Sequence, residues 1–410
     1  MKKIVVIGGG ISGVTSAINA KNDNNEIIIL EGKESPLKKL LITGNGRCNY
    51  FNEEFIPSKY HSSNEDILKD LITQENKIKI LNFFENIGIV PRIKDGYYYP
   101  YSNQAVSVKN SFLKEIDNKN IKIKLNSYVK DIKKENDKFL VFCNNETIIC
   151  DKVIISTGGK SYSKTGSDGF GYNMCEKLGH TINKTLPGLV GLKCEGSFFK
   201  KLNGVRSKAT VSLFINDKFV EKEIGEVQFT NYVLSGICIF NLSSLVSRAL
   251  EEKEKVKISI NFLDDLAINN KDDFKEFFLS MNSNLLNRTI SDFLDNLLNY
   301  KLTNVILDRT RMNGDKLLSE FTENEINVLG KNLLYFSVNV IDTNGYDMAQ
   351  VTTGGVSLCE IDPLTFQSKL IPGLYLTGEV LDVDGICGGY NIAFAVLSGI
   401  IAGESVKKLW

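Results

Sequence analysis

Apolar positions near both ends of the chain fall into short runs that predict alternating strands and helices. Buried strands are expected over residues 4–7, 26–30, 152–156 and 373–379, and helices over 11–21 and 392–406. Helical periodicity also covers residues 64–90 and 103–118, with an aromatic loop at 96–101 between them. The first and last parts of the chain therefore have α/β character.

The middle of the chain has a different pattern. Residues from about 185 to 262 alternate between apolar and polar, as strands do, whereas residues from about 263 to 328 form charged, Leu-rich helical segments. We interpret the two stretches as an inserted β subdomain and an inserted helical subdomain.

A glycine-rich turn follows the first strand. Gly8, Gly10 and Gly13 have the G-x-G-x-x-G spacing, in which the glycines permit a tight turn, the approach of a pyrophosphate, and close helix packing. The second strand ends at Glu31, where a carboxylate accepts hydrogen bonds from a ribose. A purely structural turn is the alternative, but strand, turn, helix and acid are all present, so we expect a bound dinucleotide.

A second glycine-rich segment, residues 382–391, opens the last helix. Helix N-termini attract negative charge, so the first helix would hold a pyrophosphate and the last would face the N1–C2=O edge of an isoalloxazine. Two such sites at opposite ends of the sequence fit FAD better than NAD.

Composition narrows the function classes. The 49 basic residues balance the 49 acidic ones, so no global field favours nucleic acid or membranes, although a local basic patch is compatible with this total. No apolar run has membrane-spanning length, and no signal peptide is evident. The eight cysteines are scattered, without metal-binding spacing, which predicts no metal and a reducing cytoplasm. A hairpin at 144–145 would place Cys143 opposite Glu146 and Cys150 opposite Phe139, apart from each other.

Four further motifs carry a resemblance to a known family: residues 44–49 (GNGRCN), 156–167 (STGGKSYSKTGS), 350–356 (QVTTGGV) and 378–391 (GEVLDVDGICGGYN). Together they resemble the bacterial BaiN-like, or aminoacetone-oxidase-type, NAD(P)/FAD-dependent oxidoreductases over nearly the whole chain. The resemblance implies an α/β fold in which a Rossmann-like FAD-binding domain, residues 1–187 and 336–410, is interrupted by a β-barrel subdomain (188–262) and a small helical subdomain (263–335).

The resemblance also assigns FAD contacts. They fall on Gly8, Gly10, Ser12, Gly13, Glu31, Lys39, Arg47, Cys48, Thr157, Gly158, Gly159, Gly378, Glu379, Gly389, Tyr390 and Asn391, with the backbone of Val129 facing the adenine.

The chain departs from the family pattern on the substrate side. A Phe-Thr-His segment of the family is Phe229-Thr230-Asn231 here, so no proton-donor role carries over to that position. Tyr98, Tyr162 and Tyr390 remain as candidate acids, each with packing against other groups as the alternative. Cys387 is a candidate thiol near the flavin, or a structural cysteine.

The family activity implied is hydride transfer from the flavin to a conjugated C=C bond of a small molecule, such as a steroid- or bile-acid-like enone, with NAD(P)H as a transient reductant. One alternative is a flavin-dependent dihydrouridine synthase acting on ribosomal RNA, to which the basic run at residues 200–208 would contribute. Another is a non-catalytic flavin-binding scaffold or sensor. The sequence leaves the oligomeric state open.

Overall fold

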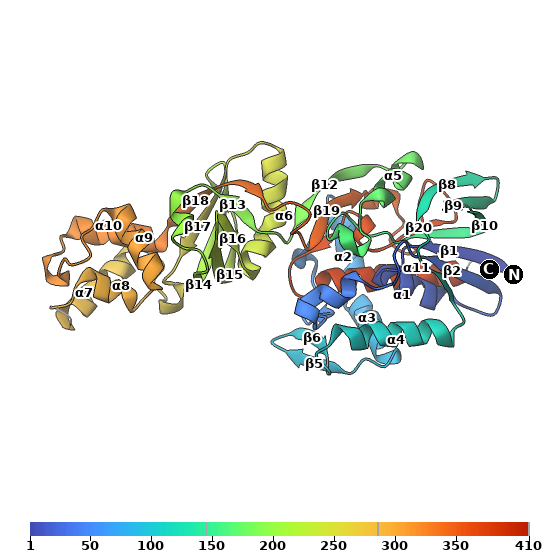
Figure 1. The fold of residues 1–410 in the computed structure, drawn as a ribbon, viewed down its shortest axis with the longest axis horizontal. Coiled ribbons are helices and arrows are strands. Elements are labelled where there is room, and N and C mark those ends of the chain that lie inside the picture. The colour runs from blue at the N-terminus through green and yellow to red at the C-terminus, as the bar shows by residue number, and fades with distance from the viewer. Residues whose placement is uncertain (145, 285–286, 409–410) are drawn as a thin grey trace. The chain divides into compact units, whose positions relative to one another are not determined.

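The chain folds into two compact units, each with its own hydrophobic core (Figure 1). The structure is a computed structural model that describes residues 1–144, 146–284 and 287–408. The terminal unit comprises Met1–Pro187 and Ala349–Trp410, and the inserted unit comprises Gly188–Met348. The inserted unit therefore ends later than the expected boundary at residue 335.

A five-stranded parallel sheet forms the centre of the terminal unit. The strand order is β20-β11-β1-β2-β7, with bounds β1 (Lys2–Ile7), β2 (Asn25–Leu30), β7 (Lys122–Lys124), β11 (Lys152–Ile155) and β20 (Leu374–Leu376). In the middle strand, Val5 is paired with Val153 on one side and Ile28 on the other. The side chains of β1 are buried from Ile4 onward, as the unbroken apolar run predicted. The α/β Rossmann-type expectation is confirmed.

Helices and small antiparallel sheets surround this sheet. The helices of the terminal unit are α1 (Ile11–Ala20), α2 (Glu65–Leu71), α3 (Gln74–Asn86), α4 (Ala105–Asn118), α5 (Phe170–Lys177) and α11 (Tyr390–Lys408). Its remaining strands are β3 (Phe51–Asn52), β4 (Tyr60–His61), β5 (Pro91–Lys94), β6 (Tyr97–Pro100), β8 (Val129–Glu135), β9 (Lys138–Cys143), β10 (Glu146–Cys150), β12 (Ile182–Gly188), β19 (Val351–Val356) and β21 (Asp384–Gly385). Within the described ranges, no helix has both the length and the apolar composition needed to cross a membrane.

Two local expectations in this unit differ from the structure. The helical pattern over residues 64–90 is two helices, because Thr73 caps the N-terminus of α3 with its side chain. The aromatic loop at 96–101 contains strand β6, which is paired with both β3 and β5. By contrast, Cys143 lies opposite Glu146 and Cys150 opposite Phe139, as predicted, although Asn145 of that turn lies outside the described residues.

The helices α1 and α11 run alongside each other (Figure 1). A Cβ added at Gly399 of α11 would lie 2.7 Å from the carbonyl oxygen of Ser12, and one at Gly403 would lie 2.6 Å from that of Ser16. The contacts move four residues along α11, from Gly399 to Gly403, as they move four residues along α1, from Ser12 to Ser16. The two helices therefore run parallel. Glycine is required at these positions because backbone contacts backbone there.

The inserted unit contains a closed six-stranded barrel. Its strand order is β13-β16-β15-β14-β17-β18, with bounds β13 (Leu192–Cys194), β14 (Arg206–Ile215), β15 (Lys218–Thr230), β16 (Val233–Ser235), β17 (Val256–Asn261) and β18 (Phe336–Thr343). Strand β18, which we expected in the FAD-binding domain, closes this barrel by pairing with β13 and β17. The region expected to be all strands also contains helix α6 (Ile237–Glu251).

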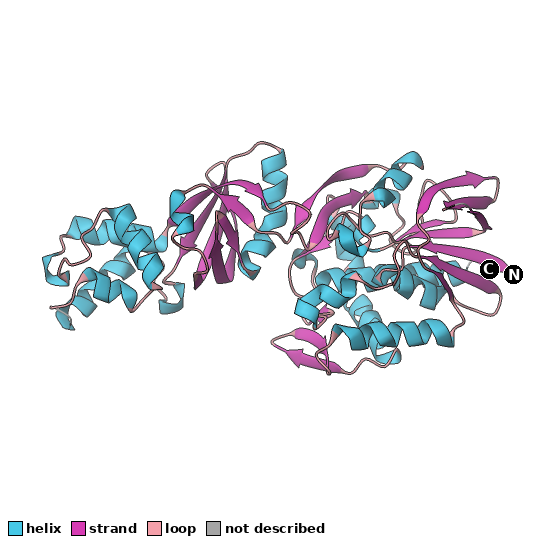
Figure 2. Cartoon of the chain, in the orientation of Figure 1, coloured by secondary structure: helices cyan, strands magenta, loops and turns pink. Residues whose placement is uncertain are grey.

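The other helices of the inserted unit form a cluster next to the barrel strands (Figure 2). Their bounds are α7 (Lys271–Asn284), α8 (Ile290–Asp295), α9 (Tyr300–Thr310) and α10 (Glu323–Leu334). Capping boxes begin two of them: Thr289 with Asp292 at α8, and Thr322 with Glu325 at α10. The Leu-rich pattern thus corresponds to a helical group.

Replacing Gly399 with Ala is expected to destabilise the protein. The added methyl group would lie 2.7 Å from the Ser12 carbonyl oxygen and 2.8 Å from the Thr15 Cβ, so the helices must separate. Overpacking costs about 1–3 kcal/mol, which exceeds the roughly 1 kcal/mol that alanine contributes through its helix propensity. Urea unfolding measures the difference, with the exposed substitution Glu404→Ala as control. An unchanged unfolding midpoint for Gly399→Ala would contradict the close packing.

Candidate active site

Four strand ends meet at the carboxyl edge of the parallel sheet. β1 leads into Gly8, β2 into Glu31, β11 into residues 156–159, and β20 into residues 377–379. In doubly wound sheets, ligands bind at this edge, where the chain switches from one side of the first strand to the other. Here β2 lies on one side of β1 and β11 on the other. Predicted cofactor residues from four separate segments therefore lie along one edge.

The glycines of the first turn have the mechanical roles expected of them. Gly8 has a positive φ of 104°, and a Cβ there would overlap the carbonyl oxygen of Ser156. A Cβ at Gly13 would overlap the carbonyl oxygen of Gly8, which is the close strand–helix approach. By contrast, a Cβ at Gly10 would meet only the Ser156 oxygen, 4.0 Å away. Gly10 therefore faces open space.

The N-terminus of α1 adjoins that space. In the described part of the chain, no side chain caps this helix, and Gly10 precedes it with extended backbone angles. Uncapped N–H groups and the positive end of the helix dipole form a site for an anion. The turn and the helix thus fit a pyrophosphate.

Glu31 is buried, and both of its carboxylate oxygens hold nearby backbone. Oε2 accepts a hydrogen bond from the Gly9 N–H at 2.8 Å, and Oε1 accepts one from the Lys33 N–H at 2.8 Å. Desolvation raises the pKa of Glu31, and the two hydrogen bonds oppose that rise. Each oxygen has a second lone pair, so ribose hydroxyls could still be accepted. The carboxylate also fixes the glycine turn, a role the sequence did not indicate.

The turn after β11 contains a buried polar atom without a partner. Gly158 has a φ of 72°, and the preceding Thr157 has a buried Oγ1 with no hydrogen-bond partner in the described structure. A buried hydroxyl usually has a partner. The Ser156 and Thr377 hydroxyls, 2.7 Å apart, join this turn to the end of β20. An orphan hydroxyl in the turn after β11 is consistent with a polar ligand at this edge of the sheet.

Lys39 and Glu379, both predicted cofactor contacts, form an ion pair with each other. The Lys39 Nζ is 2.7 Å from Oε2 of Glu379, while Oε1 accepts from the Thr352 N–H at 2.8 Å. The pair joins the 3-10 helix at Lys39–Gly46 to the one at Gly378–Val380 and to β19. Both side chains are partly exposed, at 25% and 19%. The ammonium keeps further donors for a ligand.

Arg47 and Cys48 are neighbours in different environments. The Arg47 side chain is exposed, donates to the Gly44 carbonyl oxygen at 3.2 Å, and lies 5.2 Å from the Tyr99 ring centre. Cys48 is fully buried, and burial raises the pKa of its thiol to about 12. Arg47 could therefore contribute a positive charge to a bound ligand, whereas Cys48 could contribute only its backbone groups and its packing.

The loop before α11 is held by the side chain of Asn391, the second residue of the helix. The Asn391 Nδ2 donates to the Gly385 carbonyl oxygen at 2.7 Å, and its Oδ1 accepts from the Gly385 N–H at 2.8 Å. Gly389 has a φ of 96°, and a Cβ there would lie 2.6 Å from the Phe51 nitrogen. The Tyr390 ring packs edge-on against Tyr60, with centres 5.6 Å apart. Asn391 thus shapes the turn that opens α11.

The parallel packing of α1 and α11 sets the spacing of their N-termini. Gly399 lies beside Ser12, so α11 begins about eight residues, or about 12 Å, before α1 along the common axis. The two positive helix ends are therefore separated along one direction. That arrangement suits a ligand with a pyrophosphate at one point and an electron-accepting ring further along.

The candidate acids occupy different settings. The Tyr98 hydroxyl donates to Oε2 of Glu53 at 2.6 Å, and burial followed by this contact raises the pKa of Tyr98 to about 12. Tyr390 is 3% exposed and packed as described above. Tyr162 lies in a turn with φ 56°, where its carbonyl accepts from the Thr165 hydroxyl. Their separate locations single out none of the three as the acid.

A histidine–aspartate pair that the sequence pattern did not predict lies next to the loop that opens α11. Strands β4 and β21 pair antiparallel, with His61 opposite Asp384. The His61 Nδ1 lies 3.1 Å from Oδ2 of Asp384, whose side chain is fully buried. Nearby, Oδ2 of Asp382 accepts from the Ser63 N–H at 3.0 Å. The only signal available was that His61 is one of two histidines in the chain.

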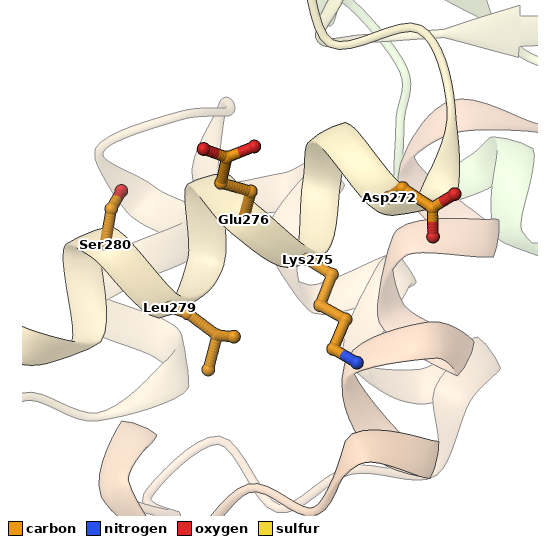
Figure 3. Close-up of a pocket in the computed structure, with 5 residues that line it drawn as sticks. All are labelled: Asp272, Lys275, Glu276, Leu279 and Ser280. Atoms are coloured by element: carbon orange, nitrogen blue, oxygen red, sulfur yellow. The ribbon is translucent and has the colours of Figure 1, made fainter.

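The other predicted residues are placed as follows. Gly378 contacts α1, since a Cβ there would overlap the Ser12 Oγ, and a Cβ at Gly159 would overlap the Thr352 Oγ1. Val129 is buried in β8 opposite Cys143, and Cys387 is partly buried. A shallow surface depression elsewhere, in the inserted unit, is lined by residues of α7 and contains no predicted site residue (Figure 3): Asp272, Lys275, Glu276, Leu279 and Ser280.

Comparisons with known proteins agree with this architecture. The family model described as the HI0933-like protein Rossmann domain matches residues 2–405. The chain is 34% identical over 410 residues to the 3-dehydro-bile acid delta(4,6)-reductase of Clostridium scindens, covering 100% of both proteins. It is 27% identical to the ribosomal RNA dihydrouridine synthase of Escherichia coli, covering 95% of this chain and 94% of that protein.

A solved structure with the same fold is the 3-ketosteroid-delta4-(5alpha)-dehydrogenase from Rhodococcus jostii, in complex with 4-androstene-3,17-dione. It has a TM-score of 0.50 and 11% identity, covering 99% of this chain and 97% of that one. The fold and the sheet-edge site define a Rossmann-type FAD-dependent oxidoreductase. The chain belongs to the HI0933-like, or BaiN-like, family of flavoproteins.

Replacing Gly10 with Ala is expected to weaken FAD binding by at least about tenfold, because the methyl group would occupy the space that the pyrophosphate approaches. Stability without FAD should be unchanged or rise by less than about 1 kcal/mol, since φ at Gly10 is −72°. Fluorescence titration with FAD and urea unfolding measure both effects. Gly13→Ala is the matched control and should lose stability itself. Wild-type FAD affinity in Gly10→Ala would show that no phosphate contacts this position.

Proposed function

We propose that this protein reduces a conjugated C=C bond of a small molecule, such as a steroid- or bile-acid-like enone, and is itself reduced by NAD(P)H. The observation that carries the proposal is the full-length match, at 34% identity, to a protein named for reducing a 3-dehydro-bile acid at its delta(4,6) positions. The edge of the terminal-unit sheet supports the proposal by offering two separated helix N-termini.

The residues of this chain would hold the cofactor in the terminal unit. The α1 N-terminus and the open face of Gly10 would bind the pyrophosphate, Glu31 the ribose, and the α11 N-terminus the pyrimidine edge of the ring. When bound, FAD would accept hydride from a nicotinamide and deliver it to the substrate. The dipole of α11 would stabilise negative charge on the ring edge, which favours the reduced cofactor.

Nicotinamide would visit the site transiently. The sequence has one G-x-G-x-x-G motif that follows a strand and opens a helix, and FAD is assigned to it. Reductant and substrate would therefore use the same face of the flavin in turn. Among the described residues, the cysteines form no disulfide, which suits a reducing, cytoplasmic compartment.

An alternative function is the reduction of a uridine in ribosomal RNA, which the 27% identical relative favours. The surroundings of the basic run at residues 200–208 weaken its expected attraction for the phosphates of RNA. Lys201 pairs with Asp308 at 2.6 Å, Arg206 with Glu226 at 3.2 Å, and Lys208 with Asp265 at 2.7 Å. Three of the cations that would attract phosphates are thus offset by carboxylates, so we favour the small-molecule substrate.

Stopped-flow spectroscopy of the FAD-loaded protein tests the proposal. In the absence of oxygen, NADH or NADPH should bleach the flavin absorbance. An enone such as a 3-oxo-4-ene or 3-oxo-4,6-diene steroid should then restore it. The saturated 3-oxo steroid is the matched control and should have no effect, because it has no C=C bond to accept hydride. Reduced steroid should form in equal amount to the flavin reoxidised.

The alternatives predict different results. Reoxidation by uridine-containing ribosomal RNA but by no enone, with dihydrouridine lost from ribosomal RNA of a deletion strain, would replace our proposal with the RNA function. Slow reduction by both nicotinamides, with no acceptor accelerating reoxidation, would favour a flavin-binding scaffold or sensor.

A further inference from the structure

The two histidines of the chain have different surroundings. The side chain of His180 is fully buried, with Nδ1 at 3.0 Å from Oε2 of Glu360 and Nε2 at 3.0 Å from the Ser368 Oγ. This connectivity resembles a hydrolase triad. However, Ser368 is 2% exposed, and its Oγ also accepts from the Ile371 N–H at 2.9 Å. A substrate has no access to this serine, so the cluster is structural.

His61 differs in having one ring nitrogen available. Nδ1 contacts the buried Asp384 carboxylate, whereas Nε2 has no hydrogen-bond partner among the described residues. The side chain is 19% exposed, so part of the ring reaches the surface of the terminal unit. The carboxylate orients the imidazole and provides a counter-charge for the imidazolium, as in other carboxylate–histidine pairs.

Three contacts fix His61 to the start of α11. Besides the pairing of β4 with β21, the Tyr60 hydroxyl donates to the Tyr390 carbonyl oxygen at 3.1 Å. The Ile386 N–H donates to the Lys59 carbonyl oxygen at 3.0 Å. The imidazole therefore has a fixed position relative to the helix end where the proposed function puts the flavin ring.

We propose that His61 is the general acid of the reaction and that Asp384 is its positioning residue. The proposal rests on the proposed function. One alkene carbon accepts hydride, with two electrons, from the reduced cofactor, which is thereby oxidised. The neighbouring carbon, next to the carbonyl, accepts the proton from His61 Nε2, so the C=C π bond is replaced by two C–H bonds. The exposed edge of the ring then regains a proton from water.

The titratable groups around His61, on its own segment and on the segments packed against it, bear on the expected pH dependence. They are Asp384 on β21, Asp382 before it, Lys59 and Tyr60 on its own segment, and Tyr390 on α11. Lys59 is paired with Glu54 at 3.2 Å, and burial raises the pKa of Tyr60 well above its usual value. An acid acts when protonated, so alkene reduction should slow as pH rises.

The test uses FAD-loaded His61→Asn, in which the amide N–H can still donate to Asp384. Reoxidation by the enone should fall by about 10²–10⁴-fold, as expected for loss of a general acid. Reduction by the nicotinamide and FAD affinity should stay within about twofold, because neither step needs this proton. The wild-type rate should fall with rising pH, and the variant should lose that dependence.

A second variant, Asp384→Asn, and a measurement without turnover complete the design. In ¹⁵N NMR of the holoenzyme, the His61 signal is the one that His61→Asn removes, since His180 is the only other histidine. Wild-type Nδ1 should be protonated, with its proton shared with Asp384. Asp384→Asn should change that nitrogen's shift and slow enone reduction while FAD is retained.

The possible outcomes distinguish the acid role of His61 from a role in cofactor binding and from failure of the proposed function. Enone reoxidation within about threefold of wild type in His61→Asn, with an unchanged pH profile, would overturn the acid role and leave the reductase function standing. Loss of FAD from both variants would assign the pair to cofactor binding and would also overturn it. If wild-type protein reduces no enone, the proposed function fails, and the acid role fails with it.

Discussion

The contact between the backbones of α1 and α11 is the constraint on which the site depends. Gly399 and Gly403 contribute no side chain to the crossing, so the backbone of α11 lies close to the Ser12 and Ser16 carbonyl oxygens of α1, and this contact limits the separation of the two helices. The N-terminus of α11 is consequently held at a set distance from the glycine turn after β1. Side chains at this crossing would move the helices apart, and the two positive helix ends would no longer match one ligand.

Several residues that the family resemblance assigns to FAD use their side chains to organise loops. Glu31 holds the glycine turn, Asn391 holds Gly385, and Glu379 holds Thr352 and Lys39. Polar groups that are already ordered need not be reorganised when a ligand binds, which lowers the entropic cost of binding. Much of the affinity would then come from backbone N–H groups and helix ends, so conservative side-chain changes at these positions act through the shape of the loops.

The sequence was informative wherever a local pattern determined the structure. The apolar run of β1, the glycine spacing and the acid at the end of β2 predicted the sheet edge correctly, because each depends on neighbouring residues. The pairing of His61 with Asp384 could not be predicted, since the residues are 323 positions apart and their strands have two residues each. Strand β18 was assigned to the wrong unit because its alternating pattern does not specify which sheet it joins.

The ion pairs of the basic run bear on the choice between RNA and a small-molecule substrate through local charge more than through their own energy. Each exposed pair among Lys201, Arg206 and Lys208 contributes only about 0–1 kcal/mol, so breaking all three on RNA binding would cost little. Their effect is instead that the paired carboxylates lower the local positive charge that would steer a polyanion to residues 200–208. A conjugated C=C bond in either an enone or a uracil ring needs one hydride and one proton. A uracil ring would make the same demand for a proton donor, but the acid role proposed at His61 is tied to the enone, and separate measurements test the substrate and the acid.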